Sequence, residues 1–375
     1  MPMAGLGTKR TLNPAAKRVF FITDSHLGIR NSSNEWIDIM RDYFFGWFIP
    51  LVKENHRPGD ILIHLGDVYD SRQSINIKVL NLGVDVFESL SEVFTDGIYV
   101  IAGNHDLWGK TSNEINSLKS IKWVPNVNIL EEPETLVLGD KKFLMMPWRK
   151  DHATEEEFLD NAGPHDYLCC HADIRGLKFN RYVTVEEGAD SKKFSKFKTV
   201  YSGHIHYSQV VNNIHMLGSP YELTRSDMGN PKSVTLLDLQ SGEETKFINN
   251  FSPKFKKFIF DQILEMTIED LEPEFRNNFV DIMIDPKMAL RAPLNILTES
   301  ITSQRKLGFH PYDPNQANSL SSQIYDTDGK QFSVMDFVKE YVGGMEYDVE
   351  TKDKLVGSLE KLYKIVVEKD QEIRL

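Results

Sequence analysis

Val19-Phe20-Phe21-Ile22-Thr23-Asp24-Ser25-His26 is an apolar run that ends in an acid and an imidazole. The same arrangement returns twice in the next part of the chain. Ile61-Leu62-Ile63 leads to Gly66-Asp67-Val68-Tyr69-Asp70, and Ile98-Tyr99-Val100-Ile101 leads to Gly103-Asn104-His105-Asp106. A short apolar run that stops at a polar cluster is typical of a buried strand that delivers a site at its carboxyl end.

Two further runs complete the pattern. Tyr167-Leu168-Cys169-Cys170 precedes His171, and Thr199-Val200-Tyr201 precedes Gly203-His204-Ile205-His206. A lone histidine is usually a surface or core residue, so none of these side chains identifies a site by itself. Together the clusters offer His, Asp and Asn ligands in sufficient number for a metal centre with two ions, which is what we predict.

Length and composition set limits on the class of protein. A chain of 375 residues suggests two domains and a small third piece. The 41% hydrophobic and 26% charged content is that of an ordinary soluble globular protein. Residues 1–17 lack a signal-peptide core, and we expect a flexible leader there. Two adjacent cysteines in a strand, Cys169 and Cys170, indicate a reducing compartment and small buried side chains.

The net charge of −12 argues against broad, non-specific coating of DNA, although it does not exclude DNA binding. Part of the acidic excess consists of candidate metal ligands. Basic clusters are usually only solvated surface, but some remain as candidate phosphate contacts. The DNA-binding candidates are Arg72, Arg149, Lys192, Lys193, Lys254 and Lys256.

Apolar periodicity predicts helices over 36–53 and 76–93 between the first strands, and such alternation indicates βαβ units. After Pro125 shorter strands are expected at 135–138, 143–146 and 210–211. A closing hairpin is expected from 233–239 and 245–248 around Ser241-Gly242. The predicted fold class is α/β: a two-sheet sandwich flanked by helices over residues 18–250, with the site at one rim.

Phe251-Ser252-Pro253 is a plausible boundary. Residues 251–320 are expected to form a small α+β capping domain, with strands within 257–266 and 278–284 and a helix over 294–302. Residues 321–375 are expected to be a linker followed by a helical hairpin, 334–342 and 352–368. Such a hairpin is a natural docking element, and packing back on its own domain fits the pattern equally well.

A site for two divalent ions needs one shared carboxylate. Asp67 is the best candidate, because it lies in the middle cluster and follows Gly66, which allows a tight turn. Asp24 and His26 alternate and are expected to project to the same side of a strand end. His204 and His206 have the same spacing, but a loop can aim them at different ions.

The remaining polar residues suggest further roles. Asn104 offers a neutral amide oxygen, and mixed nitrogen and oxygen ligands suit Mn²⁺, Fe or Zn²⁺ better than Ca²⁺. His105 adjoins a ligand and is placed to protonate a leaving oxygen, which typically contributes about 10²–10⁴-fold to a rate. Asp70 could orient a ligand imidazole or His105. Asp106 most simply caps the next turn, and support of a ligand from behind is its alternative role.

The ordered set D-x-H, G-D-x-x-D, G-N-H-D, H and G-H-x-H, over about residues 18–240, resembles the calcineurin-like metallophosphoesterase superfamily. The resemblance implies a catalytic role for His105 and two ion sites that share one carboxylate. By this likeness one ion would be held by Asp24, His26, Asp67 and His206, and the other by Asp67, Asn104, His171 and His204.

Several details resemble the SbcD-type DNA repair exonuclease subunit, and most of all its tailed-phage recombination-endonuclease members. They are Asp24-Ser25-His26-Leu27-Gly28, Gly66-Asp67-Val68-Tyr69-Asp70-Ser71-Arg72, His171-Ala172-Asp173-Ile174-Arg175-Gly176 and Gly218-Ser219-Pro220. Some members carry His where Asp70 stands, where it assists in handling the DNA strand. Here that second histidine is absent, so the double-histidine arrangement is not carried over.

The resemblance implies a nuclease that uses two divalent ions, Mn²⁺ in the first place with Mg²⁺ as the alternative. It would cut duplex ends exonucleolytically and single strands endonucleolytically in DNA repair and recombination. It implies an SbcC-type ABC ATPase partner bound by residues 333–368, and a homodimer through 76–93 and 111–121. The expected location is the cytoplasm, that of a bacterial host if the chain is phage-encoded.

Two competing hypotheses use the same core. One is a small-molecule phosphodiesterase or phosphatase, which would gain from an arginine that clamps a terminal phosphate; Arg72 and Arg149 are the nearest candidates. The other is a scaffold with a vestigial metal site. The presence of every expected ligand argues against the scaffold.

Overall fold

The computed structural model describes residues 10–110, 114–284, 308–311, 348 and 351–358. The chain divides into two compact units, Met1–Pro253 and Lys254–Leu375. Within the described residues no helix is long and apolar enough to cross a membrane.

The first unit contains a six-stranded sheet in the order β15-β14-β2-β3-β4-β5. Its strands are β2 (Arg18–Ile22), β3 (Asp60–His64), β4 (Ile98–Ile101), β5 (Val127–Leu130), β14 (Ser233–Asp238) and β15 (Glu244–Ile248). Strands β2 to β5 run parallel, and β14 joins β2 antiparallel. Because parallel strands end at the same edge, the first three polar clusters of the sequence meet there.

A seven-stranded sheet in the order β1-β6-β7-β8-β11-β13-β12 forms the second layer. Its strands are β1 (Arg10–Asn13), β6 (Glu134–Leu138), β7 (Lys141–Met146), β8 (Tyr167–His171), β11 (Thr199–Gly203), β12 (Gln209–Val211) and β13 (Ile214–Met216). Strands β7, β8 and β11 are parallel, so His171 and Gly203 lie side by side at the ends of β8 and β11. A small pair, β9 (Ile174–Arg175) and β10 (Ala189–Asp190), follows β8 in the chain.

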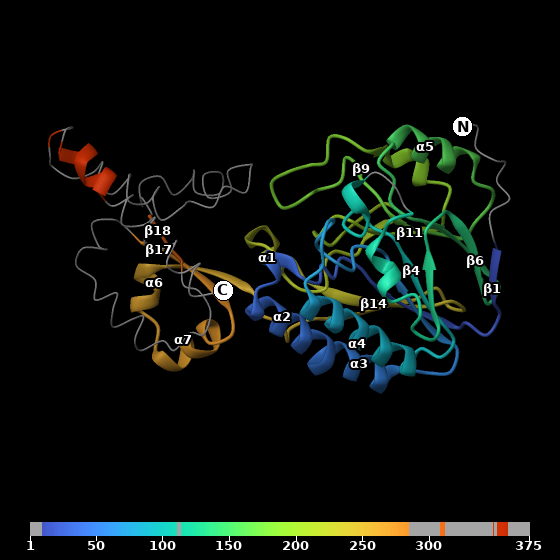
Figure 1. The fold of residues 1–375 in the computed structure, drawn as a ribbon, viewed down its shortest axis with the longest axis horizontal. Helices are drawn as coiled ribbons and strands as arrows, with labels where there is room; N and C mark the ends of the chain where they lie inside the picture. The colour runs from blue at the N-terminus through green and yellow to red at the C-terminus, as the bar shows by residue number, and fades with distance from the viewer. Residues whose placement is uncertain (1–9, 111–113, 285–307, 312–347, 349–350, 359–375) are drawn as a thin grey trace. The chain divides into compact units, whose positions relative to one another are not determined.

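Helices cover the sandwich on both sides, with α2, α3 and α4 on one and α5 on the other (Figure 1). They are α2 (Asn34–Arg41), α3 (Ile49–Asn55), α4 (Ile77–Val93) and α5 (His152–Asn161), and a π-helical segment, Asp42–Phe48, joins α2 to α3. The element labelled α1 (Ile29–Ser32) is a turn with left-handed backbone angles. Short 3-10 turns lie at Trp108–Lys110, Ser117–Ser120, Ser191–Phe194 and Arg225–Asp227.

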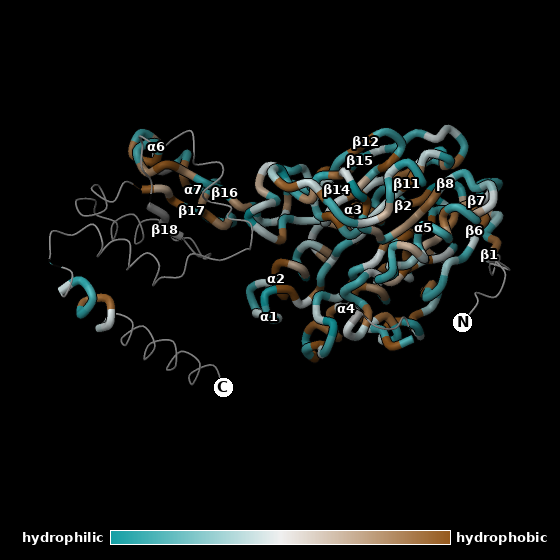
Figure 2. The backbone as a smooth tube through the Cα atoms, turned by 90° about the horizontal axis from the view of Figure 1, so that it is seen from above, coloured by the Kyte–Doolittle hydropathy of each residue, from teal (hydrophilic) through white to brown (hydrophobic). Residues whose placement is uncertain are grey.

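The main core lies between the two sheets. Phe21 of β2 stacks on Tyr201 of β11 with ring centroids 4.3 Å apart, and Cys169 belongs to the same cluster. Cys170 points to the opposite face of its sheet and packs with Phe158 of α5. Figure 2 shows hydrophobic colouring along the central strands, β2 and β8 among them. Both cysteines are buried free thiols, as expected.

The predicted α/β two-sheet sandwich with flanking helices is confirmed. The helix predicted over 36–53 corresponds to the stretch from α2 to α3, and the helix predicted over 76–93 corresponds to α4. The predicted closing hairpin is β14–β15. The expected flexible leader differs, because residues 10–13 form β1 and pair in parallel with β6. This pairing uses backbone groups at a sheet edge, and the side chains of a four-residue strand leave little signal for it in the sequence.

The second unit has a three-stranded parallel sheet of β16 (Phe255–Ile259), β17 (Phe279–Ile284) and β18 (Gly308–Pro311). Helices α6 (Phe260–Leu264) and α7 (Ile268–Phe275) supply apolar side chains to its core. The strand expected within 257–266 ends at Ile259, because the chain continues from there as α6. Residues 351–358 are helical. The helices expected at 294–302 and 334–342, and the rest of 352–368, lie outside the described residues.

Candidate metal centre

The candidate ligands lie in loops just beyond the strand ends. Asp24, His26, Asp67 and His204 have φ of 52°, 44°, 56° and 85°, a left-handed backbone that is uncommon for residues other than glycine. The expectation that Asp24 and His26 would converge through strand alternation is therefore wrong in its geometry. The loops converge instead by backbone pairing, with Asp24 N on Gly66 O and His26 N on Asp67 O, each 3.0 Å.

Two glycines allow the loops to approach each other closely. A Cβ on Gly66, which has a φ of 94°, would lie 2.7 Å from His171 Nδ1 and from the backbone nitrogen of Gly103. A Cβ on Gly103 would lie 2.2 Å from Asp67 Oδ1. Both separations are below van der Waals contact, so a side chain at either position would displace a candidate ligand.

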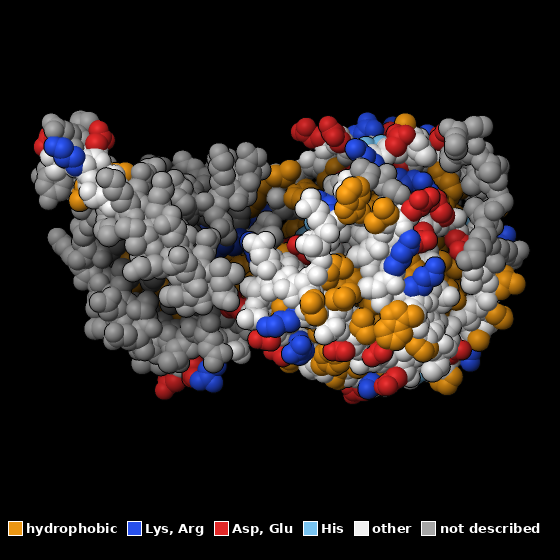
Figure 3. Space-filling model, viewed as in Figure 1, with side chains coloured by type: hydrophobic (Ala, Val, Ile, Leu, Met, Phe, Trp, Pro, Cys, Tyr) orange, Lys and Arg blue, Asp and Glu red, His pale blue; other side chains and the backbone are white. Residues whose placement is uncertain are grey.

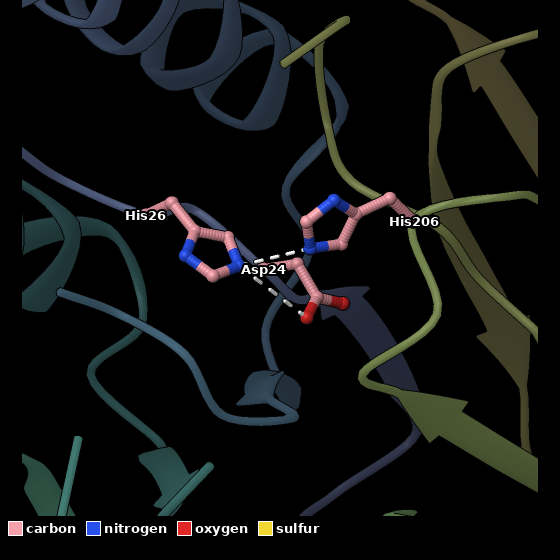
Figure 4. A group of neighbouring side chains, drawn as sticks. All are labelled: Asp24, His26 and His206. Atoms are coloured by element: carbon pink, nitrogen blue, oxygen red, sulfur yellow. Dashed lines mark hydrogen bonds and ion pairs between the residues drawn. The ribbon is translucent and has the colours of Figure 1, made fainter. Parts of the chain in front are cut away.

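The first ligand group consists of Asp24, His26 and His206. Figure 4 shows their side chains turned toward one another from different loops. His26 Nε2 lies 3.0 Å from His206 Nε2 and 3.9 Å from Asp24 Oδ1. Burial, together with the neighbouring His26, lowers the pKa of His206 to about 4, which keeps this imidazole neutral and able to bind a metal.

The second ligand group consists of Asp67, His171 and His204, and Asn104 joins it. The Asn104 Oδ1 atom lies 2.8 Å from His204 Nδ1 and 3.1 Å from His171 Nε2. His204 and His206 thus face different groups, one of the two arrangements that their spacing allows.

Asp67 lies between the two groups. Its Oδ2 is 3.5 Å from His26 Nε2 of the first group and 3.4 Å from His171 Nε2 of the second. Its Oδ1 accepts a 2.7 Å hydrogen bond from the backbone N–H of His105. Although burial raises the pKa of this carboxyl, the histidines outweigh burial and hold the pKa well below its usual range. Asp67 is placed as a bridging carboxylate requires.

Three of the imidazoles are oriented by an acceptor on their other nitrogen. His171 Nδ1 donates to Leu65 O at 2.7 Å, His26 Nδ1 lies 3.1 Å from Asp70 Oδ1, and His204 Nε2 lies 2.6 Å from Asp173 Oδ1. The remaining nitrogen of each ring faces the candidate centre, as in metal sites whose ligands are held by outer hydrogen bonds. Asp173, two residues after His171, had no assigned role in the sequence interpretation.

The donor set fits divalent cations. Asp24 and Asp67 are 0% and 1% exposed, and their ion pairs within the described part of the chain are to histidines. Burial lowers the pKa of His171, but Asp67 outweighs burial and raises it to about 9. In the absence of a metal, an imidazolium therefore offsets the buried carboxylates. Two carboxylates, four imidazoles and an amide oxygen match the mixed ligand sets of Mn²⁺, Fe and Zn²⁺.

His105 lies beside the two groups and is partly exposed. Its Nδ1 is 2.6 Å from Asp70 O, so this nitrogen donates and Nε2 is left as the acceptor. Arg72 Nη2 donates to that Nε2 at 2.6 Å, and Arg72 Nε donates to Asn104 O. Burial lowers the pKa of His105, which favours the neutral ring. His105 also lies within 4.8 Å of ligand atoms of His26 and Asp67.

Asp106 has a larger role than the expected cap of the next turn. Its carboxylate accepts from Gly103 N in its own loop and from Asp67 N, Val68 N and Tyr69 N in the neighbouring loop, at 2.8–3.2 Å. The alternative of a role behind the ligands fits better than the cap alone, because the main partners are about forty residues away in sequence, on the loop of Asp67.

A buried histidine also escaped the sequence interpretation. His64 Nδ1 accepts from Gly66 N, and its Nε2 lies 2.8 Å from Ser25 Oγ. Burial lowers the pKa of His64 to about 3, so it joins the Asp24 and Asp67 loops as a neutral ring.

The six DNA-binding candidates are scattered. Arg72 contacts residues of the centre, as described above. Arg149 pairs with Glu132, Lys193 pairs with Asp160, and Lys192 lies on the same exposed 3-10 turn as Lys193. Lys254 and Lys256 belong to the second unit, where Lys256 pairs with Glu274 at 3.0 Å.

Comparison with known proteins agrees with this geometry. The model of a family described as calcineurin-like phosphoesterase matches residues 17–208, which include every candidate ligand. The chain belongs to the calcineurin-like phosphoesterase family. The family resemblance inferred from the motifs is thereby confirmed. Membership of this family makes the chain a phosphoester hydrolase, and the fold implies divalent metal ions.

Individual relatives of this calcineurin-like chain include exonuclease subunit 1 of Enterobacteria phage T4. The two are 26% identical over 236 residues, 62% of this chain and 68% of the phage protein. An archaeal phosphodiesterase is similar at 14% identity and a TM-score of 0.32, over 62% of this chain and 99% of its own. A protein of unknown function from Aquifex aeolicus is similar at 18% identity and a TM-score of 0.25, over 48% and 93%.

Proposed function

We propose that the chain is the nuclease subunit of a DNA-processing complex, cutting duplex ends exonucleolytically and single strands endonucleolytically with two Mn²⁺ ions. The observation that carries the proposal is the position of Asp67 Oδ2, within 3.5 Å of histidine nitrogens from both ligand groups. A shared carboxylate between two nitrogen-rich groups is what a two-metal phosphoesterase requires.

The proposed ligands divide between two ions. Asp24, His26, Asp67 and His206 would hold one, and Asp67, Asn104, His171 and His204 the other. Two such ions polarise a phosphate and lower the pKa of a bound water. The chain itself supplies fixed imidazoles, because Leu65 O, Asp70 and Asp173 hold three of the rings from behind.

His105 is the proposed catalytic side chain. With Nδ1 on Asp70 O, its Nε2 remains as the reactive nitrogen and faces the Arg72 guanidinium. A scissile phosphate bound there would draw the Arg72 guanidinium away from Nε2. His105 would then take up a proton at Nε2 from solvent and pass that proton to the leaving oxygen. The contribution expected of such a residue is about 10²–10⁴-fold.

Similarity to phage T4 exonuclease subunit 1 supports DNA as the substrate and a second subunit as the partner. We propose an SbcC-type ABC ATPase as that partner, bound through residues 333–368, of which 348 and 351–358 are described and 351–358 are helical. The acidic total charge of −12 favours a restricted DNA contact over coating of the duplex.

A homodimer is proposed through residues 76–93 and 111–121, of which 111–113 lie outside the described residues. Figure 3 shows apolar side chains gathered over α4 and the neighbouring turns. Ile77 is 75% exposed and Ile115 is 59% exposed, and Trp108 and Trp123 are exposed nearby in sequence. Exposed apolar patches of this kind mark association surfaces. The molar mass of the full chain in solution, measured by light scattering, tests this face.

A second function, hydrolysis of a small phosphate ester, is favoured by one contact. Arg72 lies at His105 and Asn104, where a guanidinium could clamp a terminal phosphate. This is the arginine that the phosphatase hypothesis required near the centre.

Cleavage assays in Mn²⁺ discriminate between the two functions. The substrates are end-labelled linear duplex, plasmid circle and single-stranded DNA, with bis(p-nitrophenyl) phosphate beside them. We expect loss of the duplex end and cutting of single strands, both reduced at least about 100-fold by His105→Ala. His165→Ala is the matched control, because His165 precedes β8 and bonds Thr135 Oγ1 far from the ligand loops.

Hydrolysis of the small ester without action on any DNA would transfer the assignment to the small-molecule phosphodiesterase. Loss of bound metal in His105→Ala would instead make His105 a ligand, which its position near His26 and Asp67 also allows.

A further inference from the structure

A second surface carries chemistry that the metal centre does not use. Residues 177–185, between β9 and β10, form a hairpin closed by Phe179 N on Val183 O and Val185 N on Leu177 O, both 2.8 Å. Asn180 Oδ1 accepts from Tyr182 N and Val183 N and fixes the tip. The hairpin is therefore an ordered projection, and Figure 1 shows the chain leaving the sheets after β9.

Two aromatic rings of this hairpin face solvent. Phe179 is 53% exposed and Tyr182 is 46% exposed. Lys178 and Arg181 are also exposed, and no acid occurs between 174 and 185. Exposed aromatic rings interleaved with basic side chains match what single-stranded nucleic acid requires, since bases stack on rings and cations neutralise phosphates.

A row of arginines leads from the hairpin toward the metal centre along residues 223–228. Arg181 Nη2 donates to Met228 O at 3.1 Å from one side, and Arg30 Nη2 donates to Leu223 O at 3.3 Å from the other. Arg225 lies on the segment itself. Burial and, to a smaller extent, Arg225 lower the pKa of Arg30, whereas Asp70 and Asp227 raise it. Arg30 and Arg181 bond to the segment that carries Arg225, and positive charge gathered along one segment favours an anionic ligand.

The residues that flank this segment are attached to the ligand loops. Tyr221 Oη donates to Ser25 O, between the ligands Asp24 and His26. Lys232 Nζ donates to His206 O at 2.7 Å and forms a buried ion pair with Asp227 at 2.7 Å. That ion pair neutralises Asp227, the one acid of residues 223–228, and leaves Arg225 as the one arginine of the segment.

We propose that hairpin 177–185 and segment 223–228 bind single-stranded nucleic acid beside the metal centre. Arg30, Arg225 and Arg181 contact successive phosphates, and Phe179 and Tyr182 stack on bases of the strand. The inference rests on the proposed nuclease function and adds the surface that holds the strand. In the first unit, the basic side chains that contact the strand are then these three arginines and not Lys192, Lys193 and Arg149.

Fluorescence anisotropy of a short labelled oligothymidine tests the surface, using the full chain with Mn²⁺ and His105→Ala to prevent cleavage. Adding Phe179→Ala and Tyr182→Ala should weaken binding roughly fivefold or more for each ring that stacks on a base. Phe45→Ala is the matched control, since Phe45 is also a partly exposed aromatic residue but lies in the helical segment Asp42–Phe48.

The arginines are tested by salt dependence. Arg181→Gln and Arg225→Gln should each reduce the slope of log K against log salt by about 0.7, the value for one phosphate contact on a single strand. Arg57→Gln should leave the slope unchanged, because Arg57 is exposed at the amino end of β3, opposite the ligand loops.

Hydrolysis of bis(p-nitrophenyl) phosphate by the hairpin variants, with His105 intact, separates the strand surface from the nuclease function. The small ester requires the metal centre but not the strand surface. If the hairpin variant and its parent bind oligothymidine equally well, the proposed strand surface is wrong, although the nuclease function is not affected. The strand surface would also be overturned if the hairpin variant lost only ATPase stimulation. Ester hydrolysis by the unaltered chain without any binding or cleavage of DNA would overturn the nuclease function and the surface with it.

Discussion

At the scale of single residues, Asp67 is the side chain that lies between the two ligand groups. Because its Oδ2 lies at almost equal distances from His26 and His171, its loss should affect both ions. We expect Asp67→Asn to lower the bound Mn²⁺ from two ions to fewer than one, with hydrolysis lost. Metal analysis by mass spectrometry after gel filtration measures the content.

Asp24 provides the matched comparison for Asp67, because it belongs to the first group alone. Asp24→Asn should lose one ion and retain the ion held by His171 and His204. An Asp67 variant that keeps two ions would contradict the bridge, as would an Asp24 variant that loses both.

Glu155 is a buried carboxyl that the mechanism does not use. Burial, with smaller contributions from Asp173 and Glu156, raises its pKa from 4.5 to about 8. Between pH 4.5 and about 8, the folded state therefore keeps the proton on Glu155, whereas the unfolded state has released it. Stability from this group is complete below about pH 4.5 and is lost as the pH rises to 8.

The variant Glu155→Gln removes this titration while keeping the shape of the side chain. The free energy of unfolding of the variant minus that of the parent should rise from pH 5 to 8, by up to about 4 kcal/mol at 1.36 kcal/mol per pH unit. Urea unfolding at several pH values in EDTA measures it, because the chelator removes the pH dependence of metal binding. A difference that does not change with pH would show that Glu155 is ionised in the folded protein.

At the scale of elements, Asp106 joins the loop after β3 to the loop after β4. Its two oxygens accept from four backbone amides, and from Ser117 Oγ at 3.3 Å. Asp106→Ala leaves these amides without their acceptor, and each unsatisfied buried donor costs roughly 1–3 kcal/mol. We therefore expect a large loss of stability together with weaker metal binding, since Asp67 belongs to one of the two loops.

Asp106→Asn keeps one acceptor oxygen and should fall between Ala and the parent in both measurements. Thermal unfolding and Mn²⁺ titration of the same samples test the link. Full metal affinity in a destabilised Asp106→Ala protein would mean that the carboxylate stabilises the fold without positioning Asp67.

The strands could be predicted from sequence because each is an apolar run with nearly complete burial. All five residues of β2, β3 and β8 are buried, and such runs have few alternatives in an α/β fold. The ligand set followed, since parallel strands deliver what comes after them to one edge. The pairing of His171 with His204 and of His26 with His206 came from the family resemblance, and the structure brings these rings together.

The loop conformations could not be predicted in the same way. Asp24, His26 and Asp67 adopt left-handed angles that cost of order 1–3 kcal/mol each, and local propensity would assign such angles to glycine. They persist because backbone bonds between distant loops, such as His26 N to Asp67 O, hold them. The orienting partners Asp173 and His64 were missed for the same reason, because their contacts depend on the assembled loops.

At the scale of the whole molecule, the candidate metal ligands found among the described residues belong to the first unit. Every proposed ligand lies between Asp24 and His206, inside Met1–Pro253. The second unit has its own sheet and its own core, built from Phe275, Ile282 and their neighbours. The chain thus joins a hydrolytic unit to a separately packed one, which is the arrangement expected if recognition and coupling reside outside the reaction centre.

Truncation after residue 330 tests this division of labour. The truncated chain retains all proposed ligands, so we expect two bound Mn²⁺ and ester and DNA hydrolysis within about twofold of the full chain, since no group of the reaction centre is altered. Stimulation by the SbcC-type ATPase with ATP should be lost, because residues 333–368 are absent. The measurement compares DNA cleavage with and without the ATPase for both chains. A truncated chain stimulated as strongly as the full one would place the docking surface within residues 1–330, whereas loss of metal would show that the centre depends on the removed segment.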